Sequence, residues 1–274
     1  MVKTDEKNTY LIPCPACFDL GLCLDCGQAF RWENTPDGWR GAVAGRAFLL
    51  SQTEKGLLVR VSDGENPTKL LCDYFDFDTD YDKIISGFDD KSLKKATTEY
   101  YGIRILRQEP WEALCSFIIS QNNNIPRIKG IISRLCENFG EEIGGGLYSF
   151  PSAETLSEKT VDDLSVLRSG FRAKYIIDAA KKVSSGEVDL EKIRTMPIED
   201  ARQELMKIKG VGAKVAECTL LYGFNRLEAF PVDVWVKRIV KELYPDGLPE
   251  CFGKNAGIAQ QYLFHWRRHI DKKG

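Results

Sequence analysis

The sequence predicts an α+β fold in which an N-terminal antiparallel β-sheet domain, residues 1–101, precedes a mostly α-helical domain, residues 102–274. In the first part, short aromatic or β-branched segments are separated by Gly, Pro, Asn and Asp, which is typical of strands joined by hairpins. After Leu93 the apolar residues recur at helical spacing instead. With 43% hydrophobic residues among 274, the chain can bury a substantial core.

The expected strands lie at residues 30–32, 38–43, 46–52 and 56–61. Residues 73–82 are acidic and aromatic and are expected to form a connector, with the join between the domains near Gly102. Beyond it, an apolar helical face at 114–118 runs into residues 122–124, all asparagine, which end that helix. Further helices are expected around residues 128–135 and 176–183, with the glycines at 144–146 in a loop.

A helix, a tight glycine hairpin and a second helix are predicted around residues 205–222. The first apolar run stops at Gly210, a Gly-Val-Gly turn follows, and the next helix begins at once. Gly210 and Gly212 permit positive φ and a close backbone approach, so the amides of the turn and of the second helix can face a phosphate. Such a site binds the DNA backbone and does not read the base sequence.

Lys214 is expected in the first turn of the second helix, with Cys218 one turn further on the same face. A partly desolvated lysine at the positive end of a helix is a candidate nucleophile, although a solvated surface lysine is the commoner case. Asp233 follows Pro231 and Val232 and precedes an amphipathic run, so it is expected to be an N-cap. Capping alone explains Asp233, but the hairpin lysine and this aspartate together form a more specific pattern.

The formal net charge is only −2, so bulk charge gives no support for a nucleic-acid partner. Any DNA binding must come from backbone amides and a few positively charged side chains at particular positions. No apolar run is long enough to span a bilayer, and no signal sequence opens the chain. We therefore expect a soluble intracellular monomer with no membrane contact, cytoplasmic and nucleoid-associated if bacterial or archaeal and nuclear if eukaryotic.

The cysteines at 14, 17, 23 and 26 form two close Cys-x-x-Cys pairs, which suggests zinc. The segment between the pairs is short, and the glycines of a zinc knuckle are missing after Cys17, so free and partly buried thiols are the favoured interpretation. Only Cys251 follows Asp233, so no iron–sulfur cluster is expected. We predict no metal site and no cofactor.

Further motifs occur at residues 26–32 (Cys-Gly-Gln-Ala-Phe-Arg-Trp), 120–125 (Ser-Gln-Asn-Asn-Asn-Ile) and 170–175 (Gly-Phe-Arg-Ala-Lys-Tyr). Together with the hairpin and residues 231–234, they make the chain resemble the 8-oxoguanine DNA glycosylase/lyases of the helix-hairpin-helix superfamily with a Gly/Pro-Asp loop. The resemblance covers nearly the whole chain. It implies a base-excision-repair enzyme that acts on double-stranded DNA containing 8-oxoguanine, removes the lesion base and cuts the strand.

The resemblance also implies a set of DNA contacts. A lesion base must be flipped out of the duplex, and Asn122 then enters the vacated space. Arg127 and Arg172 contact the orphaned cytosine, for which planar guanidinium donors are suited, and Phe171 wedges beside it. From the residues alone, Asn122 would be a helix C-cap and both arginines would be solvated.

The base pocket is implied in the same way. Oxidation at C8 turns guanine N7 from an acceptor into a donor, and the carbonyl of Gly27 is implied to read that change, since a missing side chain permits close approach. The base lies between Cys218 and Phe264, with Gln260 on its Watson–Crick edge. Gln260 and Phe264 are one helical turn apart and can face one pocket. Core packing would explain Cys218 and Phe264 equally well.

In the implied mechanism, Lys214 attacks the sugar C1′ as the base leaves, and Asp233 stabilises the positive charge that develops. The resulting imine permits β-elimination on the 3′ side. Two positions depart from the eukaryotic pattern, since Phe171 replaces a tyrosine and Trp235 a histidine. The first puts strict discrimination for cytosine in doubt. The alternatives are a glycosylase of the same fold for another damaged base and a non-catalytic helix-hairpin-helix DNA-binding module.

Overall fold

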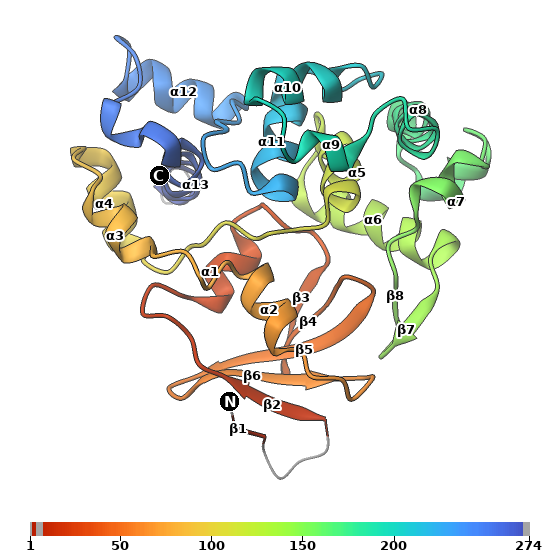
Figure 1. Ribbon diagram of the computed structural model, residues 1–274, viewed down its shortest axis with the longest axis horizontal. Coiled ribbons are helices and arrows are strands. Elements are labelled where there is room, and N and C mark those ends of the chain that lie inside the picture. Colours follow the sequence, from red (N-terminus) through yellow and green to blue (C-terminus); the bar gives the residue numbers. More distant parts are fainter. Residues whose placement is uncertain (1, 4–7, 271–274) are drawn as a thin grey trace.

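The computed structural model describes residues 2–3 and 8–270 and has the predicted α+β architecture (Figure 1). Within these residues, six strands form one antiparallel sheet in the order β1-β2-β6-β5-β4-β3. The strands are β1 (Val2–Lys3), β2 (Thr9–Ile12), β3 (Trp32–Thr35), β4 (Gly38–Val43), β5 (Arg46–Thr53) and β6 (Gly56–Val61). The bounds of β4 and β6 agree with the sequence prediction, whereas β3 begins at Trp32 and β2 was not anticipated.

One face of the sheet buries alternate side chains. Phe48 and Leu50 of β5 and Val59 of β6 are buried there against Leu71 and Tyr74. The last two belong to α2 (Thr68–Tyr74), which lies with α1 (Leu20–Asp25) between the sheet and the other helices (Figure 1). The alternation follows from the two-residue period of side chains along a strand.

Helical structure begins earlier than the sequence suggested. The region expected as an acidic connector is bordered by α2 and by α3 (Tyr81–Ser86), and α4 (Lys91–Glu99) starts before Leu93. Two acidic residues are helix caps: the carboxylates of Asp80 and Asp90 accept the amide hydrogens of Lys83 and Leu93. Residues 75–80 form the connection between α2 and α3, whereas the ends of the predicted connector, Asp73 and Asp82, lie within these helices.

The remaining helices form the upper layer in Figure 1. Helix α11 is central to it, since every residue from Val215 to Phe224 is buried. The helices are α5 (Pro110–Ser120), α6 (Ile125–Phe139), α7 (Ala153–Ser157), α8 (Ala173–Ser184), α9 (Leu190–Ile193), α10 (Ile198–Met206), α11 (Ala213–Phe224), α12 (Val234–Leu243) and α13 (Ala256–Ile270), with 3-10 turns η1 (Asp163–Leu167), η2 (Gly170–Arg172) and η3 (Glu250–Asn255). A short hairpin of β7 (Glu142–Gly144) and β8 (Leu147–Tyr148) follows α6.

The two layers share buried contacts. Tyr81, Phe88 and Leu93, from α3, α4 and the loop between them, lie in the same hydrophobic core as α5, α11 and α13. Arg104 is 1% exposed, and its guanidinium donates to the carbonyl oxygens of Cys17, Phe75, Asp76 and Thr79. Arg104 thereby satisfies these buried carbonyl acceptors and anchors the segment that connects the sheet to the helices. Among the described residues, no helix combines the length and the apolarity that a membrane span needs.

Candidate active site and DNA-binding surface

The predicted hairpin joins α10 to α11. Gly210 has φ +81°, and a Cβ there would lie 2.4 Å from the ring of Tyr175, so only glycine fits. Gly212 has φ −100°, so of the two glycines it is Gly210 that uses the positive φ that both permit. Gly212 is the N-cap of α11, has open space where a Cβ would be, and makes no side-chain cap bond. The first amides of α11 therefore lack a side-chain acceptor, as an anion-binding helix start requires.

Lys214 lies in the first turn of α11 and is half-buried against α5. Its Nζ is 3.1 Å from Ser120 Oγ and 5.3 Å from the ring centroid of Phe117. Ser120 in turn donates to the carbonyl oxygen of Phe117. The amine is thus held beside the end of α5. Among the ion pairs of the described residues, none includes Lys214.

Asp233 is the N-cap of α12, as predicted. A single oxygen, Oδ1, accepts both capping amides, 2.9 Å from Trp235 N and 2.8 Å from Val236 N. This arrangement leaves Oδ2 outside the cap. Asp233 therefore serves as a cap while one carboxylate oxygen stays available for another charge.

Cys218 brings Lys214 and Asp233 together electrostatically. Burial raises the pKa of its thiol to about 11, while the positive charge of Lys214 opposes this shift and the negative charge of Asp233 adds to it. The charges of both side chains therefore act on the Cys218 sulfur. Lys214 at the start of α11 and Asp233 at the start of α12 thus influence the same buried thiol with opposite signs.

Gly27 and α13 form a second group. Gly27 has φ +88°, and a Cβ there would be 3.5 Å from Phe264 Cε1, 3.6 Å from Ile125 Cδ1 and 3.3 Å from Arg268 Nη1. Gln260 is buried, and its Oε1 is without a hydrogen-bond partner among the described residues. The buried amide oxygen of Gln260 is thus left available as an acceptor, one helical turn before the half-buried Phe264.

A buried glutamine fixes the position of Gly27, and sequence analysis missed it. Gln28 Nε2 donates to the carbonyl oxygens of Cys23 (3.1 Å) and Arg104 (2.8 Å), and its Oε1 accepts from Leu106 N at 2.9 Å. From the other side, Gln261 Nε2 donates to the carbonyl oxygen of Cys26 at 3.1 Å. The only sequence signal was a polar residue inside the apolar 26–32 motif.

The predicted duplex-contacting residues form a third group around the loop from α5 to α6. Asn122 is exposed with φ +47°, and Phe171 is 47% exposed with its ring centroid 4.4 Å from Arg172 Cζ. Arg172 is buried and donates to the carbonyl oxygens of Gln121 (Nε, 3.0 Å) and Asn122 (Nη2, 2.9 Å). Its guanidinium thereby holds the loop.

Arg127 is exposed at the start of α6, near the same loop. Burial of Arg172 is the main cause that lowers its pKa, and the positive charge of Arg127 is the second cause. The two guanidinium groups are therefore neighbours. Ser120 precedes the Gln121–Asn124 loop and contacts Lys214, which links the duplex-contacting loop to the lysine.

The sequence relatives agree with this arrangement. Residues 11–114 match the N-terminal domain of 8-oxoguanine DNA glycosylase, and residues 115–247 match the HhH-GPD superfamily base excision DNA repair proteins. An N-glycosylase/DNA lyase of Saccharomyces cerevisiae is 37% identical over 82% of this chain and 68% of its own length. A probable N-glycosylase/DNA lyase of Methanothermobacter thermautotrophicus is 32% identical over 92% of this chain and 94% of its own length.

The chain belongs to the N-glycosylase/DNA lyase family. The family predicted from the motifs is thus confirmed. A solved relative is the Clostridium acetobutylicum 8-oxoguanine glycosylase/lyase in complex with double-stranded DNA containing cytosine opposite 8-oxoG. It has a TM-score of 0.85 and 37% identity, with 93% of each chain covered.

The paired cysteines of this family member do not assemble into a zinc site. Cys17, Cys23 and Cys26 are buried and free, and Cys23 donates to the carbonyl oxygen of Gly102 at 3.2 Å. Burial raises the pKa of Cys26 to about 12, which keeps the thiol protonated. In the part of the chain that the structure describes, no three His, Cys, Asp or Glu side chains gather as a metal site would require.

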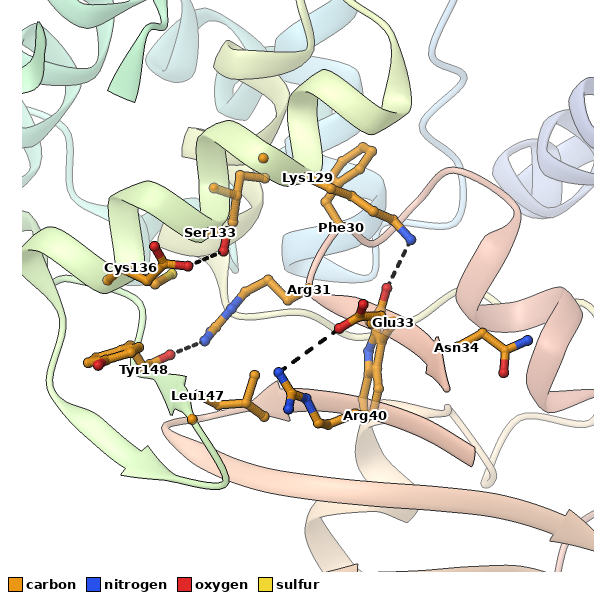
Figure 2. A pocket seen from close by; sticks show the side chains of 15 residues that line it. Phe30, Arg31, Glu33, Asn34, Arg40, Lys129, Ser133, Cys136, Leu147 and Tyr148 are labelled. Carbon is orange, nitrogen blue, oxygen red and sulfur yellow. Dashed lines mark hydrogen bonds and ion pairs between the residues drawn. The ribbon is translucent and has the colours of Figure 1, made fainter. Parts of the chain in front are cut away.

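A separate cavity of about 390 Å³ lies between β3, α6 and β8 (Figure 2). Its cations are already engaged: Arg31 with Glu112 and the Tyr148 carbonyl, and Lys129 with the Trp32 carbonyl at 2.9 Å. None of the predicted site residues lines it. The predicted catalytic residues therefore lie outside this cavity, Lys214 at the start of α11 and Asp233 at the start of α12.

Proposed function

We propose that this protein excises 8-oxoguanine from duplex DNA and cleaves the strand at the resulting abasic site, with Lys214 as the nucleophile. The observation that carries the proposal is the place of Lys214 in the first turn of α11, with its Nζ 3.1 Å from Ser120 Oγ and outside any ion pair of the described residues. An amine that no carboxylate holds in a salt bridge is free to reach the sugar as a nucleophile.

Duplex binding is assigned to two surfaces. The uncapped amides at the start of α11 suit a backbone phosphate, which holds the DNA independently of its sequence. The exposed Asn122 and Phe171 suit the space from which the lesion nucleotide is extruded, and Arg127 and Arg172 suit the base left behind. Arg172 already donates to the carbonyl oxygens of Gln121, Asn122 and Ser169, so a base would compete with these acceptors.

Recognition of the lesion is assigned to the group around Gly27. The base would stack between the buried Cys218 thiol and the Phe264 ring, and the raised pKa of Cys218 keeps that thiol neutral against an aromatic surface. The unsatisfied Gln260 Oε1 would accept a hydrogen from the Watson–Crick edge of a purine. The Gly27 carbonyl would accept the N7 hydrogen that only the oxidised guanine carries.

The excision step begins with the neutral amine of Lys214. A bond forms between Nζ and C1′ while the C1′–N9 bond breaks, and its electron pair leaves with the base, which takes up a proton as the lysine nitrogen loses one. Positive charge develops on the sugar during this exchange. The free Oδ2 of Asp233 suits the stabilisation of that charge.

Strand cleavage follows from the amine adduct. The C1′–O4′ bond opens, O4′ takes up a proton, and the nitrogen lone pair forms a protonated C1′=N imine. The imine acidifies C2′–H. After that proton is removed, the C3′–O bond breaks and its electron pair leaves with the 3′ phosphate. Water then hydrolyses the imine and releases Lys214, so the cycle consumes only water.

Borohydride trapping tests this proposal on a duplex with one 8-oxoguanine opposite cytosine. We expect a covalent protein–DNA adduct with the native protein and none with Lys214→Gln. Lys192→Gln is the matched control, since Lys192 is a surface lysine paired with Asp189 at 3.2 Å. Tight lesion binding without an adduct would instead indicate a non-catalytic module, and an adduct only with another damaged base would overturn the assigned substrate.

A further inference from the structure

Glu217 is a buried carboxylate with both oxygens in use. It lies on α11 between Lys214 and Cys218 and is 8% exposed. Its Oε1 accepts from Arg202 Nε at 2.5 Å, and its Oε2 accepts from Phe230 N at 2.6 Å. Arg202 belongs to α10, so this one side chain connects α10, α11 and the segment that leads to α12.

The contact with Phe230 bears directly on Asp233. Phe230 is followed by Pro231 and Val232, and then by the Asp233 cap. Three residues span at most about 10 Å of extended chain, and Pro231 has a fixed φ, so little slack separates the Phe230 amide from the Asp233 carboxylate. A shift of Phe230 away from α11 would therefore move Asp233 relative to Lys214.

The charge of Glu217 is also kept away from the nucleophile. Arg202 neutralises it, whereas Lys214 takes no part in an ion pair among the described residues. The same guanidinium also pairs with Glu199. Glu217 can therefore hold the 230–233 segment without trapping the neighbouring lysine as a salt-bridged ammonium.

We propose that Glu217 is a positioning residue for excision: its carboxylate sets the separation between Lys214 on α11 and Asp233 at the start of α12 through the Phe230 amide. This inference rests on the proposed function of Lys214 and Asp233. It predicts that the chemical step, and not DNA affinity, depends on an acceptor at position 217.

Replacing Glu217 alone would leave the guanidinium of Arg202 without its buried partner. The test therefore uses variants in which both charges of this ion pair are removed. Arg202→Met/Glu217→Met removes the ion pair and the acceptor for Phe230 N. Arg202→Met/Glu217→Gln also removes the ion pair but keeps an amide oxygen as the acceptor. Single-turnover excision of 8-oxoguanine opposite cytosine and the Kd for a duplex with a non-cleavable abasic analogue are measured for both.

We expect the Met/Met variant to excise at least about tenfold more slowly than the native protein, since a misplacement of about 1 Å costs up to about 100-fold. Its Kd should stay within about twofold of the native value, because the duplex contacts are untouched. The Met/Gln variant should recover to within about threefold of the native rate. Glu228→Met is the control, since it breaks a 2.7 Å ion pair with Arg226 in the same segment but leaves α11 attached.

Three results would overturn the positioning role: a native excision rate in the Met/Met variant, an equally slow Met/Gln variant, or a parallel loss of rate and affinity. Circular dichroism and thermal unfolding of both variants establish that each is folded. The outcome is separable from the proposed function, because failure of the native protein to form the trapped adduct rejects the function before any Glu217 variant is compared.

Discussion

Lys214 Nζ lies 3.1 Å from Ser120 Oγ, which joins the first turn of α11 to the last residue of α5. Ser120 is followed at once by Gln121, where the loop with Asn122 begins. Lys214 and the loop assigned to the space left by the flipped base are therefore both attached to Ser120. If the loop enters DNA as proposed, its movement would act on the amine of Lys214 through Ser120.

Ser120→Ala should slow excision while duplex affinity is kept. The substitution removes one hydrogen bond, with a net value of about 1 kcal/mol, so the single-turnover rate should fall by about fivefold. Ser120→Thr keeps the hydroxyl and should stay near the native rate. Equal rates for the alanine variant and the native protein would show that Ser120 does not orient Lys214.

The two hairpin glycines should respond differently to alanine. Gly210→Ala places a Cβ in a left-handed conformation and against Tyr175, so we expect a loss of at least about 2 kcal/mol in the free energy of unfolding and weaker duplex binding. Gly212→Ala meets open space at φ −100° and should keep the native melting temperature. Thermal unfolding of both variants checks this, and similar losses would contradict it.

Gly27→Ala should separate base removal from strand cleavage. The added methyl group would contact Phe264 and Arg268, so excision of 8-oxoguanine should fall about 100-fold or more, while cleavage of a preformed abasic site continues because no base enters the pocket. Gly145→Ala is the control, with φ +62° and nothing within 4 Å of the new Cβ. Loss of both activities in Gly27→Ala would place its effect outside the base pocket.

Phe171→Tyr should sharpen the choice of opposite base. Phe171 is 47% exposed beside Arg172, and a hydroxyl there adds a hydrogen-bonding group next to the orphaned base. One such bond corresponds to about a fivefold change, so the ratio of excision opposite cytosine to excision opposite adenine should rise by about that factor. The melting temperature should not change. An unchanged ratio would assign opposite-base selection to other residues.

Alkaline pH should destabilise the fold through Cys218. Its pKa is raised by burial from 9.0 to about 11, so the stabilising contribution is complete below pH 9 and is lost as pH rises toward 11. Each pH unit in this window costs about 1.4 kcal/mol for this thiol. Urea unfolding between pH 8 and 11 should give a steeper decline for the native protein than for Cys218→Ala. Parallel curves would contradict the raised pKa.

Much of the fold could be predicted from local patterns of apolar and polar residues in the sequence. Strands β4 and β6 were predicted with their observed bounds because glycines and polar residues border alternating apolar side chains. Local pattern failed at α3 and α4, where Asp80 and Asp90 act as caps. It also failed at β2, which pairs with β6 across a long sequence separation.

Some residues of the candidate site could be predicted from the sequence and others could not, for a related reason. Lys214 and Asp233 belong to short contiguous motifs, so their neighbourhood could be inferred from the sequence. Gln28 and Glu217 also make hydrogen bonds to other segments of the chain, at Arg104 and Phe230, and the spacing of residues in the sequence does not predict such partners. The burial of Arg172 against the α5–α6 loop could not be predicted for the same reason.

The hydrogen bond from Gln261 to the Cys26 carbonyl joins residues 235 positions apart. The segment that carries Gly27, in the first part of the chain, is therefore held in place from α13. A variant cut before α13 loses this hydrogen bond, and the position of Gly27 then depends on the bonds of Gln28.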